Sequence, residues 1–176
     1  MLAKCAEALA LRRAFPAELK ASLPGARIDQ PYRDGGWTTR QVVHHLADSH
    51  MNAYIRTRFA LAEDNFTVKP YDENRWAEFP DAKATDVSGS LAILTGLHAR
   101  WTTLLHTLDA AAFDRPLLHP ERGPMTLGTL VQLYAWHGRH HTAHILGLYR
   151  PTLYSKMRKY GIADERSQRS SAPPSE

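Results

Sequence analysis

Histidine is concentrated in two short stretches of this sequence, and its spacing there fits metal binding. The chain has ten histidines; the segment WHGRHHTAHI, residues 136–145, holds four of them, and the segment HHLADSH, residues 44–50, holds three. His137 and His141 are one helical turn apart, so on a helix both imidazoles could bind the same ion. Both also fall on the same side of that helix as Leu130, which directs them toward a core.

A third ligand is expected from the other histidine segment. On a helical wheel this segment belongs to a polar stripe that consists of His45, Ser49, Asn52 and Arg56. Burying a polar stripe is unfavourable unless its groups are satisfied, and a metal ion with its waters would satisfy them. We therefore expect His45, His137 and His141 to bind one ion as neutral imidazoles, with at least one position open for water or substrate. An open position is typical of a catalytic ion.

Other assignments of the histidines stay open at this level. The pair His140 and His144 has the same spacing, although His140 is turned about 60° away from the leucines. Adjacent histidines can also be helix-surface residues, which is our expectation for His44, His50 and His140. A single inward-facing histidine is more often a hydrogen-bonded core residue than a ligand.

Polar and aromatic residues near the histidines are candidates for supporting roles. Asp48, one turn beyond the first histidine, could orient a ligand or be a solvated helix carboxylate. Arg56 could hold an anionic substrate group, together with Asn52, or form a surface ion pair. Tyr71 and Trp76 could cover the site, although a tryptophan more often anchors a loop to the core. The sequence has no HExxH motif, and no glutamate adjoins either histidine segment as a general base.

Helices must position these side chains, and helical periods dominate the sequence. The expected helices cover residues 2–14, about 38–61, 89–108 and about 126–149. The sequence TTRQ predicts a capping box between Thr38 and Gln41 at the start of the second helix. Asp109 is expected to cap a short turn after the third.

The connections between the expected helices indicate the fold class. Residues 63–88 form a long segment with little period, which is typical of a lid or binding loop, and residues 115–125 should form a shorter crossing. Four principal helices with one long crossover predict an all-α antiparallel four-helix bundle. We expect one domain, residues 1–162, followed by a disordered tail, residues 163–176.

Composition and charge argue against several functions. The formal charge is +4 and the pI is near 9.3, but the basic residues are scattered, so nucleic acid is not expected as a partner. No apolar run approaches the ~20 residues of a membrane span. The single cysteine, Cys5, excludes an intrachain disulfide and suits a reducing cytosol, so we expect a cytoplasmic protein.

The histidine segments and their surroundings resemble the YfiT-like metal-dependent hydrolases of the DinB superfamily. The resemblance is carried by the strings GGWTTRQVVHHLADSHMNAYIRTRFAL, KPYDENRWAE, HARW, HPERG and LYAWHGRHHTAHI. It covers about residues 30–148, whereas the segment before residue 25 looks shortened or diverged. The resemblance implies an up-down-down-up four-helix bundle with one divalent metal ion per chain, held by His45, His137 and His141.

The resemblance also implies an activity. Relatives include enzymes that join a low-molecular-weight thiol such as bacillithiol to an electrophile, so we expect a thiol S-transferase with a small-molecule thiol and an electrophile as substrates. A metal-dependent hydrolase and a non-enzymatic metal-binding stress protein are the alternatives. Asn52, Arg56 and His144 are the expected substrate-binding residues. Zinc or nickel is the expected metal, with iron and manganese as further candidates, and a homodimer is the expected assembly.

Overall fold

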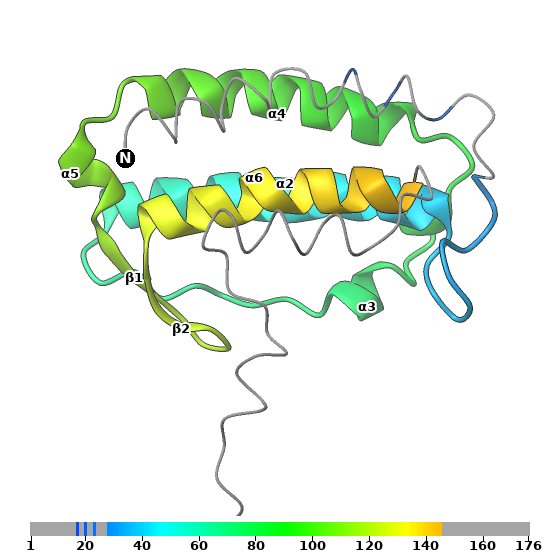
Figure 1. The fold of residues 1–176 in the computed structure, drawn as a ribbon, viewed down its shortest axis with the longest axis horizontal. Helices are drawn as coiled ribbons and strands as arrows, with labels where there is room; N and C mark the ends of the chain where they lie inside the picture. Colours follow the sequence, from blue (N-terminus) through cyan, green and yellow to red (C-terminus); the bar gives the residue numbers. More distant parts are fainter. Residues whose placement is uncertain (1–16, 18–19, 21–22, 24–27, 146–176) are drawn as a thin grey trace, which may run out of the picture.

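Three long helices form most of the protein. The computed structural model describes residues 17, 20, 23 and 28–145 (Figure 1). The long helices are α2 (Thr39–Ala62), α4 (Ser88–His106) and α6 (Leu127–Ile145). The shorter elements are α3 (Glu73–Trp76), the 3-10 helix η1 (Asp81–Lys83), α5 (Ala110–Phe113), β1 (Pro116–His119) and β2 (Gly123–Thr126). The expected helix at 2–14, the last residues of the final helix and the tail lie outside the described residues.

The start of α2 is fixed by the predicted capping box. The Gln41 backbone N–H donates to Thr38 Oγ1 at 3.2 Å, and the Thr38 N–H donates to Gln41 Oε1 at 3.0 Å. The Gln41 amide also donates to the Ala77 carbonyl at 2.9 Å, which attaches the end of α3 to the start of α2. The prediction that Asp109 caps a short turn is confirmed at α5. The three predicted long helices are therefore present, with ends shifted by one or two residues where both are described.

Helix α2 is central because it packs against both α4 and α6. The contacting pairs are His44–Ser90 and His50–His98 toward α4, and Arg56–Tyr134 and His45–His141 toward α6. In the first set the residue numbers of both helices increase together, whereas in the second set the number on α6 decreases as the number on α2 increases. Helices α2 and α4 are therefore parallel, and α6 is antiparallel to both. This confirms the down-down-up order of these three helices, and the long crossover expected from the sequence is what makes α2 and α4 parallel.

The two connections are more structured than the sequence predicted. The long one returns along the bundle from the end of α2 to the start of α4 and contains α3 and η1 (Figure 1). The shorter one, expected as a simple crossing, is an antiparallel hairpin of β1 and β2. Its Leu118 accepts from the Val68 N–H at 2.8 Å and donates to the Phe66 carbonyl at 3.0 Å. Gly123, at φ +77°, adopts the left-handed conformation that follows the hairpin turn.

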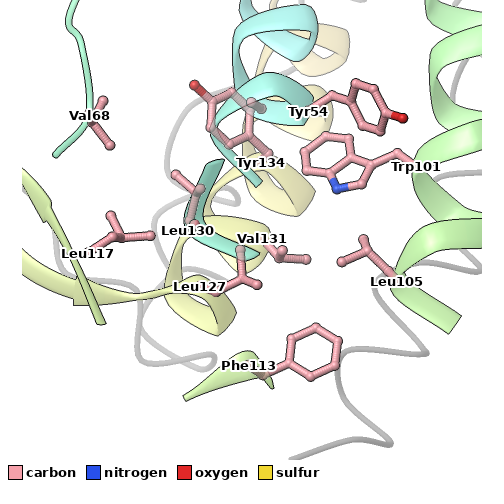
Figure 2. Close-up of a cluster of buried hydrophobic side chains, with 12 residues drawn as sticks. Tyr54, Val68, Trp101, Leu105, Phe113, Leu117, Leu127, Leu130, Val131 and Tyr134 are labelled. Atoms are coloured by element: carbon pink, nitrogen blue, oxygen red, sulfur yellow. The ribbon is translucent and has the colours of Figure 1, made fainter. Parts of the chain in front are cut away.

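The apolar core consists of two clusters. The larger one joins α2, α4, α5, β1 and α6 around Trp101, Leu105, Leu130 and Tyr134 (Figure 2). The smaller one contains Val42, Val43, Leu46, Ala47 and Leu94. Along α2 the two clusters are separated by a buried polar stretch that includes Ser49 and His50. Within the described residues, none of the helices has the length and hydropathy that crossing a bilayer requires.

Candidate metal centre

Three histidines from two helices converge at one point between α2 and α6. Each of His45, His137 and His141 has a ring nitrogen placed so that the three nitrogens lie within 4.8 Å of one another. The ring centroids are 5.3 Å apart for His45 and His137, 5.1 Å for His45 and His141, and 4.5 Å for His137 and His141. The structure thus brings together the three residues that were expected to bind an ion.

The donor set suits a divalent cation. The Nε2 atoms of His45 and His137 are 3.3 Å apart. Two imidazole nitrogens that share a zinc ion at about 2.0–2.1 Å are themselves separated by about 3 Å, so these two rings already have a suitable spacing. The third ring, that of His141, has a nitrogen within 4.8 Å of a nitrogen of each of the other two.

His45 is held as a neutral imidazole. Its side chain is only 4 % exposed, and the Trp37 ring lies 4.8 Å from its own. Burial lowers the pKa of His45 to about 4, because the charged form would lose its hydration. The ring therefore has an uncharged nitrogen lone pair at neutral pH, as a metal ligand requires.

The other histidines of the two segments differ from the surface positions that we expected. His44 and His50 are buried: His44 contacts Ser90 Oγ at 2.8 Å, and His50 contacts His98 Nε2 at 2.9 Å. The expectation was wrong because α2 is covered on two sides, so it has no fully exposed face near its start. His140 is half-buried and stacks on Trp136 with ring centroids 4.5 Å apart. The side chain of His144 lies outside the described part of the structure.

Arg56 is buried and is not the surface residue of the alternative interpretation. It is 7 % exposed and donates to the Tyr134 hydroxyl at 3.0 Å and to the Lys69 carbonyl at 2.9 Å. No carboxylate among the described residues forms an ion pair with it. The Tyr134 ring is in turn 5.7 Å from the His137 ring, which places Arg56 one side chain away from the three histidines. Half-buried Asn52 donates to the Asp48 carbonyl at 2.9 Å.

Aromatic residues of the long connection lie against this part of α2. Tyr71 stacks obliquely on Trp76, with ring centroids 4.6 Å apart, and its ring is 5.8 Å from the Arg56 guanidinium. Burial raises the pKa of the Tyr71 phenol well above its usual range, and a hydrogen bond with Ser49 partly offsets this. Since Ser49 follows His45 by one turn, the connection covers the polar stripe of α2.

His119 on β1 is a further buried residue near Arg56, and the sequence analysis assigned it no role, although it begins the string HPERG. It is 6 % exposed, and its Nδ1 accepts from the Glu121 N–H at 3.3 Å. Burial lowers its pKa, and the positive charge of Arg56 lowers it further. The only sequence signal was its alternation with Leu117 in the segment PLLH, which marks both as inward-facing residues of a strand.

Asp48 is a half-buried carboxylate on α2. Burial raises its pKa from its ordinary value of 3.8 to about 6; the negative charge of Asp81 adds to the shift and His44 opposes it. Its role in orienting a ligand histidine stays a prediction.

The shift at Asp48 predicts a pH dependence of stability. The folded state binds this proton more tightly than the unfolded chain, so the free energy of unfolding should fall as the pH rises from about 4 through about 6. Asp48→Asn should remove that part of the fall and raise the melting temperature at pH 7. Thermal melts of the metal-free protein between pH 4 and pH 8 measure this. Asp114→Asn, which removes an exposed carboxylate, is the control. Identical pH profiles for wild type and Asp48→Asn would contradict the prediction.

Comparison with known proteins places the chain in a family. A model described as the DinB superfamily matches residues 9–145, so the chain belongs to the DinB superfamily.

The names of similar proteins describe putative metal-dependent hydrolases. The chain is 52 % identical to "Putative metal-dependent hydrolase YfiT" of Bacillus subtilis (strain 168) over 139 residues, which cover 77 % of this chain and 78 % of the relative. It is 55 % identical over 122 residues to a "Putative metal-dependent hydrolase" of Bacillus mycoides (strain KBAB4), covering 69 % and 70 % of the two chains.

A solved structure has the same fold. YfiT from Bacillus subtilis, described as "a probable metal-dependent hydrolase with an unusual four-helix bundle topology", superposes with a TM-score of 0.76 at 45 % identity, covering 89 % of this chain and 87 % of that chain. The fold expected from the sequence is thereby confirmed.

Proposed function

We propose that this protein is a metal-dependent enzyme that uses His45, His137 and His141 to hold one divalent cation and transfers a small thiol to an electrophile. The observation that carries the proposal is the convergence of three imidazole nitrogens within 4.8 Å of one another, from two helices. The names of the relatives, which describe metal-dependent hydrolases, support the metal dependence. An all-imidazole donor set suits zinc and nickel, the metals that we propose, and it also suits copper and iron.

The protein's own residues keep the site neutral and partly dry. Three neutral imidazoles add no negative charge, and buried His45 resists protonation. When bound, a divalent cation supplies Lewis-acid chemistry, because it lowers the pKa of a water or thiol that coordinates to it. The aromatic pair Tyr71 and Trp76 of the long connection lies beside Arg56.

The absence of a glutamate beside either histidine segment favours a thiol over water as the nucleophile. The sequence has no glutamate beside either histidine segment. A thiol has an ordinary pKa of about 8.5 and needs much less activation than water, whose pKa is about 15.7. In the proposed reaction the thiol releases its proton to solvent, its sulfur bonds to the electrophilic carbon, and the leaving group departs with the electrons of the broken bond. A bacillithiol-type thiol would be the physiological donor.

Arg56 provides a place for an anionic group of that thiol. A buried guanidinium is unfavourable without a counter-charge, and among the described residues its hydrogen bonds go to a phenol and a carbonyl rather than to a carboxylate. A substrate carboxylate would supply the negative charge. Asn52, one turn earlier on α2, and His144 are the other substrate-binding residues that we propose.

Arg56→Met should therefore lower kcat/KM selectively. The loss of a charge-assisted hydrogen bond predicts a decrease of about 10- to 100-fold for a thiol that carries carboxylates. A neutral thiol of similar pKa should lose much less. Steady-state kinetics with both thiols measure the difference. Arg58→Met is the control, because Arg58 is exposed on the same helix and donates to the Tyr54 hydroxyl. Equal losses for both thiols would contradict a role in binding the anion.

The reaction class can be decided with the full chain purified without a histidine tag. Elemental analysis measures the bound metal, and the metal-loaded protein is then incubated with a chromogenic electrophile and a panel of cellular thiols. We expect a product that forms only with both thiol and enzyme. No thiol-dependent product, together with turnover of a chromogenic ester or amide, would identify a hydrolase, the alternative that the relatives' names favour. Absence of a bound metal would exclude both the S-transferase and the metal-dependent hydrolase.

Two further expectations accompany this proposal. The single cysteine suits a reducing compartment, which supports a cytoplasmic location. A homodimer is expected from the family resemblance, and light scattering of the purified chain would measure it.

A further inference from the structure

A chain of four imidazoles leads from the three-histidine site into the core. His45 Nε2 is 3.3 Å from His137 Nε2, and His137 Nδ1 is 3.5 Å from His50 Nε2. His50 Nδ1 is in turn 2.9 Å from His98 Nε2, and the planes of these two rings differ by only 15°. This series of imidazoles involves three helices: it leads from α2 to α6, back to α2 and on to α4.

The inner two members of this chain are fully inside the protein. His50 is 0 % exposed and His98 is 2 % exposed, and Trp101 packs edge-on against both rings. Two imidazoles in an apolar core are unfavourable unless their polar atoms are satisfied. The contact between the two rings satisfies only one of the two nitrogens of each imidazole. This pair also reaches His137, on the ring edge opposite to the nitrogen that faces His45.

Metal binding through His137 Nε2 would set the tautomers of these imidazoles. A ligand that binds a metal through Nε2 must carry its hydrogen on Nδ1 when it is neutral. His137 Nδ1–H can then donate to His50 Nε2, and His50 Nδ1–H can donate to His98 Nε2. Donation in this direction satisfies every contact and leaves His137 Nε2 as a lone pair that faces the site, whereas donation in the reverse direction would place a hydrogen on that nitrogen.

We propose that His50 and His98 are positioning residues that hold His137 in the Nδ1–H tautomer and in the correct ring orientation for metal binding. The proposal rests on the metal site of the proposed function and adds to it the two buried histidines that contact the ligand His137 from the core. Hydrogen-bond partners of metal-binding histidines typically change metal affinity by about 10- to 100-fold when they are removed. Before metal binds, His45 is the donor in the contact with His137, so only His45 has to change its tautomer.

The affinity experiment compares four full-length variants with the wild type. Competition for zinc with a chromophoric chelator should show a loss of about 10- to 100-fold for His50→Leu and a smaller loss for His98→Leu. His98→Gln should bind close to wild type, because its amide oxygen can accept from His50. His44→Leu is the matched control. His44 is a buried histidine of α2 that also reaches α4, through Ser90, but it is not one of the four imidazoles that lead from the metal site into the core. Circular dichroism establishes that each variant is folded.

A second readout needs no substitution. Long-range proton–nitrogen NMR of the metal-free wild type should show His137 in the Nδ1–H tautomer, and His98→Leu should shift it toward Nε2–H. A wild-type His137 that is mainly Nε2–H would overturn the proposal, even if the leucine variants fail to fold. Unchanged zinc affinity in folded His50→Leu and His98→Leu would also overturn it while leaving the metal site intact. A wild type that binds no divalent metal would overturn the metal site itself, together with this inference.

Discussion

His137→Ala and His141→Ala should each lose bound metal while the helical bundle stays folded. Each substitution reduces three imidazole ligands to two. Removal of an outer hydrogen-bond partner alone typically weakens binding by about 10- to 100-fold, so removal of a direct ligand should weaken it more. Both side chains are half-buried and belong to neither apolar cluster, so their loss removes little of the core. Elemental analysis and circular dichroism of the purified variants measure the two effects.

His140→Ala distinguishes this assignment from its alternative. His140 is on the same helix, next to His141, and stacks on Trp136. It should keep its metal, and thiol transfer should follow the metal content across the three variants. Full metal occupancy in His137→Ala or His141→Ala, with loss in His140→Ala, would instead favour the pair of His140 and His144.

Trp101→Ala should be the most destabilising single substitution in the described core. Trp101 is 1 % exposed and lies where α2, α4 and α6 meet, with Tyr54 and Tyr134 at ring distances of 6.4 and 6.2 Å (Figure 2). Truncation of a buried tryptophan leaves a large cavity and typically costs about 3–5 kcal/mol. That is a large part of the about 5–15 kcal/mol by which a domain is usually stable.

Urea denaturation followed by circular dichroism gives the free energy of unfolding without using the tryptophan signal. Ile93→Ala is the matched control, since Ile93 is on the same helix but 41 % exposed, and its loss should change stability by no more than about 0.5 kcal/mol. A similar small effect for Trp101→Ala would show that the meeting point of the three helices is not tightly packed.

The sequence was sufficient to predict the long helices, because their signals are local. The capping box at Thr38 and Gln41 and the cap at Asp109 each involve residues within one turn of each other. The parallel arrangement of α2 and α4 and the hairpin of β1 and β2 depend on contacts between distant segments. The pairing of Leu118 with Phe66 and Val68, which fixes the hairpin to the long connection, could not be read from either segment alone.

The positions of the candidate ligands were predictable for a similar reason. His137 and His141 share a helix face with Leu130, and the buried stripe that contains His45 follows one face of α2. The helical wheel failed for His50 because it assumes one buried face per helix, whereas α2 is packed on two sides.

His98 was missed because the buried stripe that the sequence indicates between residues 89 and 108 contains only hydrophobic residues: Leu94, Leu97, Trp101, Leu104 and Leu108. Leu94 and Trp101 are buried, but Leu97, Leu104 and Leu108 are only half-buried. The more deeply buried side chains are Leu94, His98, Trp101 and Leu105. Their spacing of four, three and four residues is equally helical, so this face was present in the sequence as an alternative.

The return segment between α2 and α4 is attached separately from the histidines that it covers. Val68 binds the hairpin and Ala77 binds Gln41, so residues 69–76 span a bridge anchored at both ends, with Tyr71 meeting α2 between them. Loops tolerate substitution better than packed helices do. Substitutions in residues 69–76 should therefore leave the three histidines in place. Chimaeras that exchange residues 69–76 should change the substrate preference and leave the stoichiometry of the bound metal ion constant.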